Sequence, residues 1–81
     1  MPIRFTAHAR DKISRLAKLG VTEEFVRRII ERPERKGLGY LGRSIMEGRL
    51  SDKLQLRIIT EQTDNNVLVI TVYPAYRSRS R

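Results

Sequence analysis

The spacing of apolar residues changes along the chain, from a helical period in the first third to strand-like alternation in the second half. After a short extended segment at residues 2–5, this period predicts a helix over residues 7–19. Thr6 is placed to cap its first turn, and Gly20 stands where helices often end on a left-handed residue. The face that this helix should bury carries Ala9, Ile13, Leu16 and Ala17.

A second helix is expected to begin directly after Thr22, which can cap it, and to end before Pro33. Glu23 and Glu24 lie in its first turn, where the positive end of the helix dipole favours acidic side chains. Its apolar stripe, which should pack on the rest of the molecule, consists of Phe25, Val26, Ile29 and Ile30.

The remaining chain is expected to form antiparallel strands. Residues 34–42 hold three glycines and are interpreted as a loop, and Pro74 is expected to end the last strand. Turn residues at 51–53 and 63–66 separate the strand candidates. These candidates are a weak one at residues 43–50, an alternating one at 54–61, and a β-branched one at 67–73.

Helices that precede a run of consecutive strands favour an α+β fold. We therefore expect a two-layer sandwich, with two N-terminal helices packed on a sheet of three or four antiparallel strands. The length of 81 residues is that of one domain, which we place at residues 1–76, and residues 77–81 are expected to form a basic flexible tail.

Charge narrows the choice of partner. The chain has 17 Lys and Arg residues against nine Asp and Glu residues, a net charge of +8, and such a domain attracts polyanions. RNA is the expected partner, and a membrane is not, because no apolar run approaches the roughly 18 residues that cross a bilayer.

Cysteine is absent, which excludes disulfides and thiolate metal sites and is typical of the reducing cytoplasm. The N-terminal segment shows no signal-peptide pattern, so a cytoplasmic location is expected. One histidine without cysteine gives no zinc ligand set, and no nucleotide-binding motif is present. The sequence therefore predicts neither a metal nor another cofactor.

The first helix carries a polar stripe of His8, Lys12 and Arg15, spaced to lie along one edge of its buried face. The two cations can bind phosphates, and His8, in the first turn, can act as a neutral base. The alternative interpretation is a solvated helix edge whose imidazole packs against the sheet.

A second group of candidates lies in the strands and the tail. Arg57 is the only charge inside its strand, and it either projects into a concave site or keeps an open sheet face wet. Tyr73 closes the last strand, and Tyr76 and Arg77 follow Pro74. A tyrosine beside arginines can stack on a base while guanidinium groups bind phosphate, and Arg79 can add to this affinity.

The N-terminal half contains two motifs, Phe5-Thr6-Ala7-His8-Ala9 and Gly20-Val21-Thr22-Glu23-Glu24. With these motifs and the strand segments 56–59 and 69–73, the chain resembles a family of small prokaryotic domains that is grouped with the RelE/ParE/BrnT-like toxins. The resemblance implies a RelE/ParE-like fold and a toxin that cuts mRNA, on the ribosome in some relatives, and that an acidic antitoxin neutralises.

The resemblance also implies that Arg57, Tyr73 and Arg77 surround the scissile phosphate. The lysine pair of the best-known RelE-like nucleases has no clear counterpart in this sequence. Three hypotheses follow: a metal-independent endoribonuclease with His8, Arg57 and Tyr73 as catalytic residues, an RNA-binding domain without catalysis, and a module that docks an acidic protein. A homodimer remains open under each of them.

Overall fold

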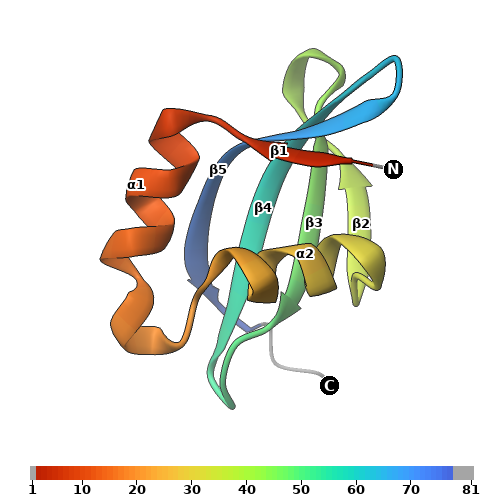
Figure 1. Ribbon diagram of the computed structural model, residues 1–81. Coiled ribbons are helices and arrows are strands. Elements are labelled where there is room, and N and C mark those ends of the chain that lie inside the picture. Colours follow the sequence, from red (N-terminus) through yellow and green to blue (C-terminus); the bar gives the residue numbers. More distant parts are fainter. Residues whose placement is uncertain (1, 78–81) are drawn as a thin grey trace.

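The computed structural model describes residues 2–77, which form a mixed five-stranded sheet with two α-helices on one side (Figure 1). In chain order the elements are β1 (Ile3–Phe5), α1 (Ala7–Arg15), a 3-10 turn (Ala17–Leu19), α2 (Glu23–Glu31), β2 (Arg35–Leu38), a 3-10 turn (Tyr40–Gly42), β3 (Ser44–Arg49), β4 (Leu54–Thr63) and β5 (Asn66–Tyr76). The expected α+β class is confirmed.

The start of α1 agrees with the sequence. The Thr6 hydroxyl accepts a hydrogen bond from the backbone N–H of Ala9 at 2.9 Å, as an N-cap does. The predicted end at Leu19 is wrong in detail, because the α-helix stops at Arg15 and the chain continues as a tighter 3-10 turn. That turn ends on Gly20, whose φ of 90° is left-handed, as expected for a residue without Cβ.

The second helix lies where the sequence placed it. The Thr22 hydroxyl accepts from the N–H of Phe25 at 3.0 Å, and α2 ends two residues before Pro33. Val26 and Ile29 are buried, and their neighbours Phe25 and Ile30 pack against the same core. Local capping and the apolar period are therefore enough to locate this element.

The sheet is larger than predicted and is not purely antiparallel. Its strand order is β1-β5-β4-β3-β2, and β1 pairs with β5 in parallel. The interpretation of residues 34–42 as a loop was wrong for Arg35–Leu38, which pairs with Ser44–Glu47 of β3. All four residues of β2 are exposed because the strand lies at the sheet edge, so no burial pattern marked it in the sequence.

The expected end of the last strand at Pro74 was also wrong, because β5 continues to Tyr76. β1 pairs only with residues 67–69 of β5, so one edge of β5 is open around Pro74. A proline that cannot donate a backbone hydrogen bond is tolerated at such an edge.

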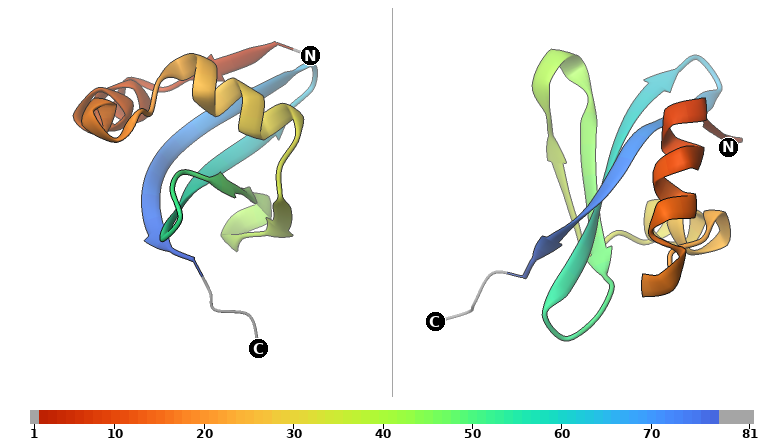
Figure 2. Two further views of the ribbon diagram at one scale, coloured as in Figure 1. Left: turned by 90° about the horizontal axis from the view of Figure 1, so that it is seen from below. Right: turned by 90° about the vertical axis from the view of Figure 1, so that its left-hand side faces the viewer.

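The hydrophobic core lies between the helices and one face of the sheet. In both views of Figure 2 the two helices lie on the same side of the strands. The sheet contributes buried residues from its three central strands, among them Met46, Leu56, Ile58, Val69 and Val72. Among the described elements no helix covers the opposite face, which we call the open face. No helix within residues 2–77 has the length and apolarity to cross a bilayer.

α2 packs tightly on β3 at Gly48. A Cβ at Gly48 would lie 2.6 Å from Cγ1 and 2.8 Å from Cδ1 of Ile29. We expect Gly48→Ala to lower the free energy of unfolding by about 1–3 kcal/mol, because the buried side chain of Ile29 must shift to make room. Gly37→Ala is the control, since nothing lies within 4 Å of the added methyl group. Urea denaturation of both variants measures the difference, and equal stability would show that α2 does not pack on Gly48.

Candidate functional site

Four polar side chains form a row across the open face of the sheet. Arg35, Glu47, Arg57 and Tyr73 lie directly opposite one another on β2, β3, β4 and β5. Cross-strand partners share a face, and the neighbours of Arg57 along β4, Leu56 and Ile58, are fully buried towards the helices. The row therefore points away from the core.

A β-bulge brings Tyr73 into this row. Ile59 pairs with Thr71 and Thr60 pairs with Val69, so Ile70 is an extra residue in β5. Its carbonyl accepts a hydrogen bond from the Thr6 hydroxyl at 3.0 Å, in the same residue that caps α1. The start of the helix thus supports the bulge, and the bulge sets which side chain faces Arg57.

Arg57 is held between two partners. Its Nε donates to Oε2 of Glu47 at 2.6 Å, and hydrogen bonding with Tyr73 and then with Glu47 raises the pKa of the guanidinium. The Glu47 side chain is only 12% exposed, and its other oxygen lies 4.0 Å from Nε of Arg35. A carboxylate buried to this extent is normally paired, as Glu47 is. The result is a fixed cation beside a carboxylate and a phenol.

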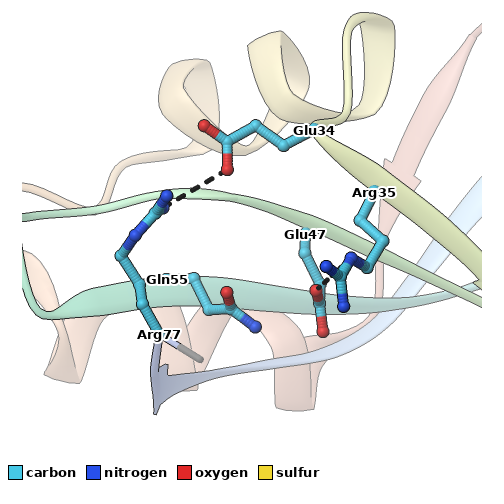
Figure 3. A pocket seen from close by; sticks show the side chains of 5 residues that line it. All are labelled: Glu34, Arg35, Glu47, Gln55 and Arg77. Carbon is cyan, nitrogen blue, oxygen red and sulfur yellow. Dashed lines mark hydrogen bonds and ion pairs between the residues drawn. The ribbon is translucent and has the colours of Figure 1, made fainter. Parts of the chain in front are cut away.

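Next to the row lies a polar pocket with a volume of about 130 Å³, lined by Glu34, Arg35, Glu47, Gln55 and Arg77. Figure 3 shows Gln55 between Arg77 and Glu47, with Glu34 reaching towards Arg77 from the segment before β2. The pocket contains two guanidinium groups, two carboxylates and one amide. The formal charges of this lining balance, and its composition suits a polar ligand and not an apolar one.

The tail candidates have different positions. The backbone N–H of Arg77 donates to the Lys53 carbonyl at 2.9 Å, and its Nη1 lies 3.3 Å from Oε1 of Glu34. Arg77 thus belongs to the pocket. Tyr76 is 81% exposed and pairs with Leu54. Because it is three residues after Tyr73 along β5, its side chain lies on the other face of the sheet and is not part of the row. Arg79 lies outside the described residues.

The helix candidates remain apart from this pocket. Nε2 of His8 lies 3.1 Å from the hydroxyl of Thr71, which is two residues before Tyr73 on β5 and faces the same side of the sheet. Arg15 pairs with Asp11 at 2.8 Å on the helix surface, and Lys12 is half-buried on the same helix. None of His8, Lys12 and Arg15 lines the pocket. The structure therefore brings Arg57 and Tyr73 together, places Arg77 in the adjoining pocket, and leaves the polar stripe of α1 outside that pocket.

Glu47 is the main residue that sequence reasoning missed, and Glu34, Arg35 and Gln55 were missed with it. A signal for Glu47 was present, because Glu47 and Arg57 are each five residues from Asp52, the middle of the predicted turn at 51–53. A tight hairpin centred on Asp52 makes the two residues cross-strand partners, as the structure has them. Opposite charges at matched positions of a hairpin are a sign of such a pair.

The described residues contain no group of three His, Cys, Asp or Glu side chains that could hold a metal ion. No protein-family model, curated protein or solved structure matches this chain. The function is therefore inferred from the geometry of the open face.

Proposed function

We propose that this protein is a RelE-like, metal-independent endoribonuclease. Its reaction centre consists of three residues of the row, Glu47, Arg57 and Tyr73. The observation that supports this most directly is the position of Arg57, which lies on the open face between a carboxylate and a phenol. An oriented cation beside a base and a proton donor is the set of groups that phosphodiester transfer requires. The net charge of +8 favours the approach of RNA.

The proposed reaction uses the 2′-hydroxyl of the RNA as its nucleophile. Glu47 takes the 2′-hydroxyl proton, the 2′-oxygen forms a bond to the adjacent phosphorus, and the bond from phosphorus to the 5′-oxygen breaks. Tyr73 gives its phenolic proton to the departing 5′-oxygen, and Arg57 stabilises the negative charge of the pentavalent phosphorus. The products are a 2′,3′-cyclic phosphate and a 5′-hydroxyl. The protonated carboxyl of Glu47 then gives its proton through solvent to the phenolate of Tyr73, which restores both groups.

Incubation of the purified protein with end-labelled single-stranded RNA in excess chelator tests this function. Cleavage is expected to proceed at the same rate with and without the chelator, because every proposed group belongs to the protein. Fragments should carry a 2′,3′-cyclic phosphate, which mass spectrometry identifies. Intact RNA under all conditions, or products with a 5′-phosphate, would contradict the proposal.

One observation favours a second candidate, an RNA-binding domain without catalysis. Glu47 already accepts a hydrogen bond from Arg57 at 2.6 Å, so part of its capacity to take a proton is occupied. In that case the open face binds phosphates without breaking them. Both functions predict affinity that falls steeply with salt, and only the nuclease predicts cleaved RNA.

The surplus of basic residues also fits an acidic protein as a second partner. If the protein is a toxin, an acidic antitoxin that covers the row would block access of RNA to Arg57. Co-expression with a short acidic protein encoded by a neighbouring gene, followed by co-purification, examines this proposal.

A further inference from the structure

The polar pocket contains two arginines that no step of the proposed reaction uses. Arg77 and Arg35 line the pocket, and the Gln55 side chain lies between Arg77 and Glu47 (Figure 3). The Arg35 side chain is 76% exposed, and its contact with Glu47 is long, at 4.0 Å. Arg57 is the closer partner of Glu47, so the guanidinium of Arg35 keeps donors for another acceptor.

Arg77 has a partner in the form of Glu34. Their closest atoms are 3.3 Å apart, and the side chains are 32% and 52% exposed, respectively. An ion pair that open to solvent contributes little to stability, so a stronger acceptor can displace the carboxylate. The backbone of Glu34 stays in place meanwhile, because its N–H donates to the Glu47 carbonyl at 2.8 Å.

The pocket adjoins the proposed reaction centre, because Glu47 belongs to both. Gln55 and Arg57 are on the same face of β4, two residues apart, a distance of about 7 Å along a strand. A chain of phosphodiesters that places one phosphate at Arg57 can therefore place a neighbouring phosphate between Arg77 and Arg35.

We infer that this pocket is a second phosphate subsite for RNA, and that the Glu34 carboxylate occupies it in the free protein as a stand-in for a phosphate oxygen. The inference rests on the proposed function for the identity of the ligand. Arg77 and Arg35 supply guanidinium donors, and the Gln55 amide supplies a neutral one. When RNA binds, Glu34 leaves Arg77 and its side chain turns to solvent.

This arrangement predicts an unusual effect for a substitution at Glu34. Removing the charge of Glu34 should strengthen RNA binding, because the phosphate then no longer has to displace the Glu34 carboxylate from Arg77. Removing any acidic residue from a basic protein also strengthens binding in a general way. Glu24 is the matched control, since it forms an exposed ion pair with Arg28 at 3.9 Å on α2.

The experiment measures the affinity of a fluorescent 2′-O-methyl oligoribonucleotide by anisotropy at one fixed salt concentration. This probe cannot be cleaved, because it has no 2′-hydroxyl proton. We expect Glu34→Gln to bind about two- to fivefold more tightly than the wild type, and Glu24→Gln to bind with nearly wild-type affinity. Arg77→Ala should bind about tenfold more weakly.

The double variant Glu34→Gln/Arg77→Ala should bind like Arg77→Ala alone, because Glu34 acts only through Arg77. Equal effects of Glu34→Gln and Glu24→Gln, or a full effect of Glu34→Gln without Arg77, would overturn the subsite. Thermal melting of each variant shows whether it is folded, and the gain in affinity at Glu34 cannot come from unfolding.

The failure of the subsite and that of the nuclease have different signatures. If the subsite exists but the reaction does not, Glu34→Gln tightens binding and labelled RNA remains intact. If the reaction exists but the subsite does not, RNA is cleaved in a manner that needs Arg57, and Arg77→Ala leaves affinity unchanged.

Discussion

Replacement of Glu47 by glutamine is expected to lower the RNA cleavage rate by about 10²–10⁴-fold, the usual contribution of a general base. The amide has the shape of the carboxylate but cannot take the 2′-hydroxyl proton. Its oxygen can still accept a hydrogen bond from Arg57, so the row should keep its geometry. Single-turnover cleavage with saturating protein measures the chemical step separately from binding.

Glu61→Gln is the control for this variant. Glu61 is on the same strand as Arg57 and forms an ion pair with Arg43 at 3.8 Å, but it lies outside the row. Glu61→Gln removes the same charge as Glu47→Gln and should leave the cleavage rate unchanged. A Glu47→Gln variant that cleaves at the wild-type rate would show that another group takes the proton, and His8 would be the next residue to test.

Replacement of Arg57 by lysine is expected to lower the cleavage rate by about 10²–10³-fold, the effect of losing one preorganised donor. Lysine keeps the charge but lacks the planar fork that holds Glu47 while it faces a phosphate. A guanidinium is protonated throughout the physiological range, and hydrogen bonds with Tyr73 and Glu47 raise the pKa of Arg57 further, so its contribution should not vary with pH there. Any pH dependence of the rate must then come from other groups.

Arg57→Ala should lose at least as much activity and some stability. Without Arg57, Arg35 at 4.0 Å is the only ion-pair partner of the nearly buried Glu47 among residues 2–77, and the loss should cost about 1–3 kcal/mol of stability. Arg43→Lys, in an exposed pair with Glu61, is the control for the loss of a guanidinium and should retain activity and stability. If Arg57→Lys cleaves RNA normally, the row is not the reaction centre.

Local sequence was sufficient for the start of both helices and contains the signal that sets Glu47 opposite Arg57. Thr6 and Thr22 cap α1 and α2 as predicted, because a cap needs only a hydroxyl next to the helix start. The partnership of Glu47 and Arg57 could also be predicted, since a turn centred on Asp52 fixes which residues face each other.

The position of Tyr73 could not be predicted in this way. Continuing the register of the β4–β5 hairpin from Thr63 and Asn66 would place Val72 opposite Arg57 and would turn Tyr73 towards the helices. The extra residue Ile70 shifts the register by one and reverses the faces. Its carbonyl is paired with Thr6, 64 residues earlier, so this contact exists only after the chain has folded.

The amino-acid sequence by itself was enough to place the two helices, the four strands β1, β3, β4 and β5, and the surplus of positive charge, and its turn at Asp52 sets Glu47 opposite Arg57. Only the tertiary structure decided the parallel pairing of β1 with β5, the edge strand β2, the bulge and hence the complete row with its pocket. The physical reason is the distance along the sequence between the residues that interact. Caps, turns and apolar periods act between residues close in sequence, whereas registers and pockets depend on contacts between distant segments.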